Sequence, residues 1–153
     1  MRKFIFLIFI INICLSCNLL AVEKGKWTFF LEDNYCYIGS MPIKEEGDYT
    51  QRGDTYTIVY RINKSPEKIV QITAGYNYDE HKPVIVKIDQ TSFKFFSKDD
   101  SAWIKDEDKK VILSMQRGIK MVVEGYSFKG TLTTDTYTLK GFSAAYNKLS
   151  KDC

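Results

Sequence analysis

Short segments in which apolar and polar residues alternate recur along most of this 153-residue chain. In the clearest of them, residues 55–62, one side consists of Tyr56, Ile58, Tyr60 and Ile62, and the other of Thr55, Thr57, Val59 and Arg61. A period of two is typical of a β-strand, because successive side chains point to opposite faces of a sheet. We therefore expect a half-buried antiparallel strand here.

The same pattern predicts further strands near residues 27–31, 35–40, 69–74, 84–88, 93–95, 119–123 and 137–139. Residues that favour turns separate them: Asp33-Asn34, Pro42, Glu46-Gly47-Asp48, Asn63-Lys64-Ser65-Pro66, Gly75, Lys82-Pro83, Asp89-Gln90 and Gly130. Aromatic residues make up 14% of the chain, and they favour strands. Many short strands with frequent turns predict an all-β fold, mainly an antiparallel β-sandwich or flattened barrel. The length provides room for one domain.

Two segments have helical rather than strand periodicity. Residues 106–117 open with three acidic residues, carry Val111, Ile112 and Met115 at helical spacing, and end in Arg117-Gly118. Acidic residues at the start and a basic residue before glycine at the end suit a helix. Residues 142–150 place Phe142, Ala145, Tyr146 and Leu149 on one helical face. We therefore expect two short helices, near 106–117 and 142–150.

The first 21 residues have the three-part layout of a secretory signal peptide. Arg2 and Lys3 precede an apolar run over residues 4–15, and small Ala21 follows. That run is shorter than the roughly 20 residues of a spanning helix. We expect a signal peptide over 1–21, cleaved after Ala21, and a single mature domain over 22–153. An uncleaved N-terminal anchor and lipidation at Cys17 are the alternatives.

Cleavage would leave two of the four cysteines, Cys36 and Cys153. Export leads to an oxidising compartment, where an even number of cysteines favours a disulfide. The apolar face of the second helix would also carry Cys153 toward the sheet. We therefore predict a Cys36–Cys153 bond, the alternatives being two free thiols or a bridge between chains.

Charge and residue types exclude several classes of function. From Val22 onward, 20 basic residues stand against 19 acidic ones, whereas a nucleic-acid binder normally has a basic stripe. With His81 the only histidine and two cysteines in the mature chain, no ligand set with metal-binding spacing is present. We expect no catalytic residue, no metal site, no cofactor and no small-molecule substrate, and no transmembrane span after signal cleavage.

Three motifs suggest a function but have simpler interpretations. Arg52-Gly53-Asp54 spells an integrin-type tripeptide, yet it also suits the turn before the strand at Tyr56. Asp79-Glu80-His81 lies in a polar segment before Pro83 and is interpreted as a solvated turn. Asp106 and Asp108 lack the further oxygen ligands of a calcium loop and are interpreted as an exposed helix start.

Several motifs, spread over about 130 residues, together resemble the invasion associated locus B proteins, a family of exported bacterial proteins. They are Trp27, residues 36–42, Arg52-Gly53-Asp54 with Tyr56, Gly75-Tyr76-Asn77-Tyr78, Ala102-Trp103, residues 115–118 with 121–125, residues 135–145 and the terminal Cys153. The resemblance implies a periplasmic or envelope-associated protein without known enzymatic activity. It also implies a link to the invasion of host erythrocytes, which is described for founding members.

Sequence and resemblance together predict a non-catalytic protein of the bacterial envelope that binds another protein, in the envelope or on a host cell. It would be periplasmic, associated with the outer membrane or secreted. The alternatives are a small periplasmic enzyme or enzyme inhibitor, and an envelope housekeeping factor with no host role. An exposed aromatic patch would favour binding, and a deep cleft with perturbed carboxylates would favour an enzyme.

Overall fold

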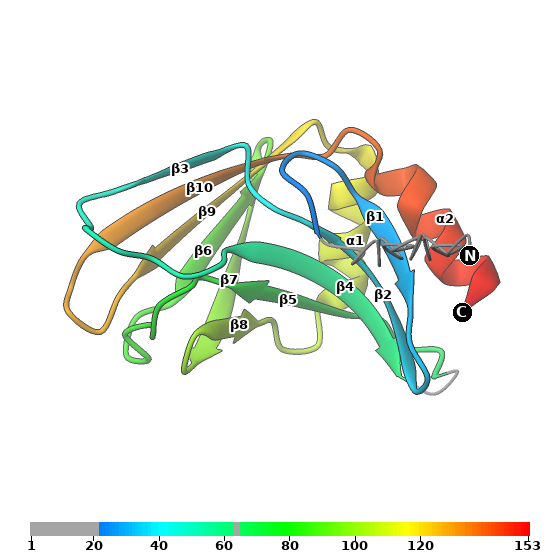
Figure 1. The fold of residues 1–153 in the computed structure, drawn as a ribbon, viewed down its shortest axis with the longest axis horizontal. Coiled ribbons are helices and arrows are strands. Elements are labelled where there is room, and N and C mark those ends of the chain that lie inside the picture. Colours follow the sequence, from blue (N-terminus) through cyan, green and yellow to red (C-terminus); the bar gives the residue numbers. More distant parts are fainter. Residues whose placement is uncertain (1–21, 63–64) are drawn as a thin grey trace, which may run out of the picture.

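A computed structural model describes residues 22–62 and 65–153 of the chain. Within this part, ten strands form one sheet in the order β1-β2-β4-β5-β8-β7-β6-β9-β10-β3, and every neighbouring pair is antiparallel. The strands are β1 (Thr28–Leu31), β2 (Tyr35–Ser40), β3 (Lys44–Gly47), β4 (Tyr56–Ile62), β5 (Ile69–Thr73), β6 (Val84–Ile88), β7 (Thr91–Lys98), β8 (Ser101–Trp103), β9 (Lys120–Tyr126) and β10 (Leu132–Thr138). The sheet curls into a half-barrel with two short helices at one end, which confirms the predicted fold class (Figure 1).

The curl depends on β7, which belongs to both halves of the sheet. Its residues 91–95 pair with β6, whereas Phe96, Ser97 and Lys98 pair with β8. Strand β2 is connected to β3 by only three residues, although β2 pairs with β1 and β4 while β3 pairs with β10. These are two of the points at which the chain passes between the two halves, and the concave side of the sheet encloses the core.

Two strands were not predicted. Lys44–Gly47 was expected to lead into a turn at Glu46-Gly47-Asp48, but it pairs with Thr133–Thr136 of β10 as strand β3. The other is β8, which has only three residues. Neither contains enough alternation to be recognised from sequence. Strand β3 is a charged edge strand, and β8 is a very short segment that forms a strand because β5 and β7 pair with it on both sides.

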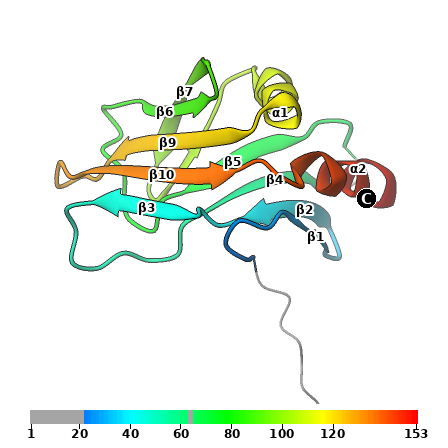
Figure 2. The same ribbon diagram turned by 90° about the horizontal axis from the view of Figure 1, so that it is seen from above.

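The two helices are α1 (Asp108–Arg117) and α2 (Phe142–Asp152), close to the predicted positions. Helix α1 begins two residues later than expected because Asp106 has φ 59°, a left-handed conformation that a right-handed helix does not accommodate. Gly141, with φ 86°, takes the left-handed position that separates β10 from α2. Both helices lie against one end of the half-barrel (Figure 2).

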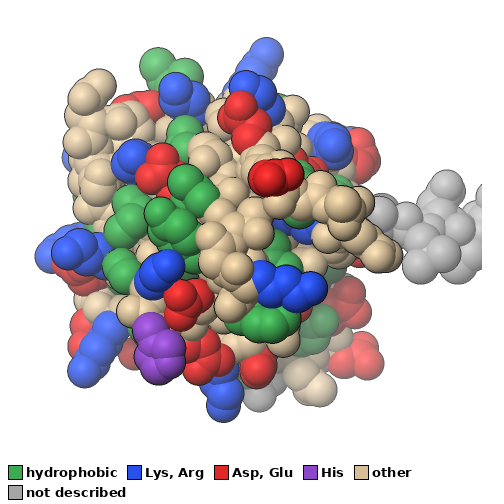
Figure 3. Space-filling model, turned by 90° about the vertical axis from the view of Figure 1, so that its left-hand side faces the viewer, with side chains coloured by type: hydrophobic (Ala, Val, Ile, Leu, Met, Phe, Trp, Pro, Cys, Tyr) green, Lys and Arg blue, Asp and Glu red, His purple; other side chains and the backbone are tan. Residues whose placement is uncertain are grey.

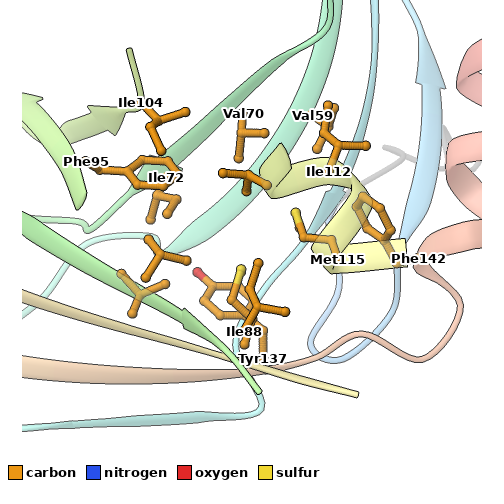
Figure 4. Packing of buried hydrophobic residues seen from close by; sticks show 14 of the residues in the cluster. Val59, Val70, Ile72, Ile88, Phe95, Ile104, Ile112, Met115, Tyr137 and Phe142 are labelled. Carbon is orange, nitrogen blue, oxygen red and sulfur yellow. The ribbon is translucent and has the colours of Figure 1, made fainter. Parts of the chain in front are cut away.

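Large apolar side chains from both helices and the sheet meet in one core. Val111, Ile112 and Met115 of α1 and Phe142 and Leu149 of α2 are buried, as the helical spacing predicted. They pack with strand residues such as Val59, Val70, Ile72, Phe95 and Tyr137 (Figure 4). The Trp27 ring meets the Phe142 ring edge-on, with centroids 4.9 Å apart. The opposite end of the half-barrel, formed by the β3–β4 and β9–β10 connections, is not covered by a helix (Figure 1).

The predicted signal peptide lies outside the described residues. Within the part that the structure describes, no helix is long and apolar enough to cross a membrane.

Candidate functional site

Cys36 and Cys153 form a disulfide in the structure. Their sulfurs are 2.15 Å apart and their Cα atoms 5.9 Å apart, within the range that the bond requires. The bond joins β2 to the residue after α2, across 117 positions of sequence. It fastens the last helix to the inner side of the sheet at the helix-covered end.

The Arg52 side chain of the Arg52-Gly53-Asp54 tripeptide points into the molecule and is only 4% exposed. Its two terminal nitrogens donate to the Asp135 carboxylate over 2.7 and 2.6 Å, and Nε donates to the Ala74 carbonyl over 2.6 Å. An integrin-type ligand would have to present this guanidinium to solvent. The adhesive interpretation of the tripeptide is therefore wrong, and the segment serves as a structural loop before β4.

Arg52 and Asp135 form a buried ion pair that was not predicted. The Asp135 side chain is 3% exposed, and burial raises its pKa, an effect that the Arg52 hydrogen bonds and charge partly offset. Burial would lower the pKa of Arg52, but the hydrogen bonds and charge of Asp135 outweigh it and raise that pKa. Each group thus depends on the other to remain charged away from water.

Aromatic side chains surround this pair. The Arg52 guanidinium carbon lies 5.4 Å from the Tyr49 ring centroid and 5.1 Å from the Tyr76 ring centroid. The Tyr76 hydroxyl is hydrogen-bonded to that of Thr133 over 2.7 Å, and burial raises the Tyr76 pKa. Gly125 belongs to this packing, because a Cβ at that position would lie 2.5 Å from a Tyr78 ring carbon.

A hollow of about 310 Å³ opens beside Arg52 at the uncovered end of the half-barrel; we call it the open-end hollow. Its lining comprises Asp48, Tyr49, Thr50, Gln51, Arg52, Tyr76, Ser127, Phe128, Lys129, Thr131 and Thr133. Figure 3 looks onto this end, where hydrophobic side chains gather among charged groups of both signs. The volume is at the lower limit for small-ligand pockets.

A carboxylate with a raised pKa, that of Asp135, lies behind Arg52 at this end of the half-barrel. Asp135 is not among the residues that line the hollow, and both of its carboxylate oxygens accept hydrogen bonds from Arg52. Nowhere in residues 22–62 and 65–153 do three His, Cys, Asp or Glu side chains come together as they would to hold a metal ion.

The other two motifs lie elsewhere and have local structural roles. Asp79 accepts a hydrogen bond from the backbone of His81 over 3.1 Å, as in a solvated turn. Asp108 is the first residue of α1, and its carboxylate accepts from the Val70 backbone N–H of β5 over 2.7 Å. Burial is the main cause that raises the Asp108 pKa. Asp108 thus ties the helix to the sheet rather than standing as an exposed helix start.

The apolar side of β4 faces outward rather than into the core. Thr57 and Val59 are completely buried, whereas Tyr56, Ile58 and Tyr60 are half-buried on the convex side and Ile62 is 46% exposed. The register explains this arrangement, since Val59 lies opposite Ile38 and Val70, which are core residues of the neighbouring strands. The strand is half-buried as predicted, but its more apolar side is the exposed one.

Neighbouring strands extend this side into a broad surface. In one row across the strands, Tyr60 lies opposite Tyr37 on β2 and Ile69 on β5. In the next row, Ile58 lies opposite Gln71 on β5. That row continues through Trp103 on β8 to Phe96 on β7. We call this surface the outer aromatic face: Tyr35, Tyr37, Tyr56, Ile58, Tyr60, Ile62, Ile69, Phe96 and Trp103. Tyr35 is 44% exposed and Phe96 55% exposed. On β2, β4, β5 and β8 the residues of this side are uncharged, whereas on β7 Phe96 lies between Lys94 and Lys98, which face the same way.

Comparison with known proteins identifies the family. Residues 23–150 match the family described as invasion associated locus B (IalB) protein. The chain belongs to the invasion associated locus B family. Among curated proteins, none matches it. The crystal structure of invasion associated protein b from Bartonella henselae is similar in fold, with 17% sequence identity and a TM-score of 0.62. The match covers 83% of this chain and 93% of the other.

Three of the motifs that suggested this family from sequence meet at the buried ion pair. Arg52, Gly75, Tyr76 and Asp135 belong to three separate motifs of the resemblance, and in the structure they contact one another or adjacent residues. Gly53 donates a backbone hydrogen bond to the Gly75 carbonyl over 2.9 Å. The family motifs were therefore the only indication in the sequence that these residues matter, and the spacing of the motifs did not indicate an ion pair.

Proposed function

We propose that this member of the invasion associated locus B family is an exported envelope protein that is not an enzyme and binds another protein through its outer aromatic face. The partner lies in the bacterial envelope or on a host cell, and in the second case the protein contributes to host-cell invasion. The name of the Bartonella henselae protein with the similar fold supports such a link.

Export is supported by the cysteine chemistry and by the N-terminal segment. A disulfide that fastens the final helix persists in an oxidising compartment and not in a reducing cytoplasm. Residues 1–21, with a basic start, an apolar run and Ala21, have the composition of a cleaved signal. Together they favour a mature domain over 22–153 located in the periplasm, at the outer membrane or outside the cell.

Protein binding is supported above all by the outer aromatic face. Monomeric proteins rarely expose large contiguous apolar patches without a function, and Tyr and Trp are enriched at protein interfaces. Here β4 presents its tyrosines and isoleucines outward while smaller Thr57 lies inside. A surface without charges at its centre is suited to an apolar partner surface.

An enzymatic role, the main alternative, would require a group free to exchange protons or attack a substrate. The buried carboxylate in the described residues that has the strongest claim to such a role is Asp135, which is engaged by Arg52. An enzyme inhibitor or a housekeeping factor would bind a protein through the same face and differ only in the identity of the partner.

Site-specific photo-crosslinking tests the proposal. A benzophenone side chain in place of Tyr60 should form an adduct in intact cells or with host membranes. The same group in place of Lys87, an exposed residue of β6, serves as the control and should not. Excess mature protein should suppress the adduct, whereas excess of an Ile58→Glu variant should not. Equal adducts from both positions, or suppression by both competitors, would refute the assignment to this face.

A further inference from the structure

The open-end hollow takes no part in the proposed protein binding, and its construction points to a ligand of its own. It lies where three connections meet: β3–β4, with Tyr49 and Arg52; β5–β6, with Tyr76; and β9–β10, with Phe128. The mouths of barrels formed by such connections are common positions for small-ligand sites.

Hydrogen bonds hold these connections together. Arg52 donates to the Ala74 carbonyl and Gly53 to the Gly75 carbonyl, which joins the β3–β4 and β5–β6 connections. The Phe128 N–H donates to the Asn77 carbonyl over 2.9 Å, which joins the β9–β10 hairpin to the same loop. A preorganised rim binds without the entropic cost of ordering mobile loops.

Aromatic rings form part of the wall of the hollow. Tyr76 is half-buried and hydrogen-bonded to Thr133, so its ring is fixed in place. Tyr49 is 36% exposed, and Phe128 is 65% exposed at the rim. A phenyl ring with two thirds of its surface in water gains stability when a ligand covers it.

Uncharged polar groups stand beside these rings. Thr50 and Gln51 are exposed, and within the described residues their side chains form no hydrogen bonds. The half-buried Thr131 also lines the hollow. Hydroxyl and carboxamide groups both donate and accept, so they match a ligand that carries many hydroxyl groups.

The charges at the hollow largely cancel, which argues against an ionic ligand. The Arg52 guanidinium is neutralised by Asp135, and Glu45 lies 3.9 Å from it. Of the remaining two charged residues in the lining, Asp48 is acidic and Lys129 basic. In the described residues, the hollow therefore offers an anion no unpaired guanidinium and a cation no pair of free carboxylates.

We infer that the open-end hollow binds a neutral oligosaccharide. The C–H-rich face of a sugar ring stacks on aromatic rings such as Tyr49 and Phe128, while its hydroxyl groups exchange hydrogen bonds with Thr50, Gln51 and Thr131. This pairing of aromatic faces with uncharged hydrogen-bonding groups is what a neutral sugar requires and what the hollow provides.

The test is an NMR titration of the ¹⁵N-labelled mature protein, residues 22–153, with tri-N-acetylchitotriose and, separately, maltotriose. At least one of the two should shift amide signals of residues 49–52, 76–77 and 127–131. Phe128→Ala should weaken that binding about three- to tenfold, as expected for the loss of one aromatic contact. Phe96→Ala, which removes a similarly exposed ring from the outer aromatic face, serves as the matched control and should leave the affinity unchanged.

Three results would overturn the inference. These are no shifts from either sugar at about 10 mM, shifts confined to the outer aromatic face, or equal affinities of the wild-type and Phe128→Ala proteins. Inorganic phosphate, titrated in parallel, should not perturb the same signals, and phosphate binding without sugar binding would identify the ligand class as anionic. None of these outcomes depends on photo-crosslinking from position 60, so the two proposals fail independently.

Discussion

Replacing Arg52 by methionine should be among the most damaging single changes at the open end of the half-barrel. Methionine retains the length and apolar character of the side-chain stem but removes the guanidinium. Asp135, whose side chain is 3% exposed, then loses both of its hydrogen bonds from Arg52. It also loses the one opposite charge within ion-pair distance of it in the described residues. The substitution therefore leaves a buried carboxylate unpaired.

The magnitude follows from that isolation. Removing one partner of a buried ion pair typically costs about 3–5 kcal/mol, because the remaining charge is desolvated and no opposite charge compensates it. The Ala74 carbonyl adds little to this cost, since it also accepts from the Thr55 hydroxyl over 3.2 Å. We expect Arg52→Met to lower the free energy of unfolding by about 3–5 kcal/mol.

A second substitution separates the charge effect from simple loss of contacts. In Arg52→Met/Asp135→Val, the orphaned carboxylate is replaced by a β-branched side chain that suits strand β10. Replacing a buried pair by apolar residues is often neutral or stabilising, so the double variant should recover most of the lost stability. Urea unfolding followed by tyrosine and tryptophan fluorescence measures all the variants, with Lys87→Met as the control.

The control breaks an exposed pair, in which Lys87 lies 2.9 Å from Glu124 with side chains 46% and 32% exposed. Such a pair contributes about 1 kcal/mol or less. If Arg52→Met costs no more than Lys87→Met, the buried pair does not stabilise the fold as argued. If the double variant is no more stable than Arg52→Met, the cost arises from lost packing rather than from an unpaired charge.

Three further predictions concern the disulfide, the buried tyrosines and the glycines. Cys153→Ser should lower the free energy of unfolding by about 2–5 kcal/mol and speed hydrogen exchange first in α2. The control Lys151→Ser, on the same helix, should have neither effect. A thiol titration that finds two free thiols per unreduced mature chain would disprove the bond. Burial raises the pKa of Tyr78 and Tyr137 above the ordinary value of 10.0, so their contribution to stability is complete below pH 10 and is lost as pH rises toward their folded pKa values. Two protons released only on unfolding correspond to a decrease of roughly 3 kcal/mol per pH unit above pH 10, and urea unfolding at pH 9–11.5 that shows no such decrease would contradict their burial. Gly75→Ala should lower the melting temperature far more than Gly130→Ala. Both glycines have positive φ, but only at Gly75 would a Cβ collide with the Gly53 backbone. Similar melting temperatures of the two variants would show that the loop rearranges to accommodate the Cβ.

Much of the local structure could be predicted from the sequence because it depends on neighbouring residues. Alternation located eight of the ten strands, and helical spacing located α1 and α2 to within about two residues. The Asp89-Gln90 turn between β6 and β7 was also correct, with Asp89 at φ 47°. In each case the signal and the structure lie within the same few residues.

The direction in which β4 faces could not be predicted in this way. Alternation defines two sides of a strand, and the more apolar side is ordinarily expected to face inward. Here the register with β2 and β5 aligns Val59 with the buried Ile38 and Val70, which places Tyr60 outside. A shift of one residue would exchange the sides, so the choice belongs to the assembled sheet rather than to the strand.

The sequence by itself determined the all-β class, the two helices and the pairing of the two cysteines expected to remain in the mature chain. Only the tertiary structure decided the role of Arg52, which was expected in a turn before the Tyr56 strand and which binds Asp135, 83 positions away in the sequence. It also decided the strand role of Lys44–Gly47 through pairing with β10. The physical reason is the same in both cases: a buried charge or an edge strand is stabilised by partners distant in sequence, and no local pattern specifies which distant residue folding brings beside it.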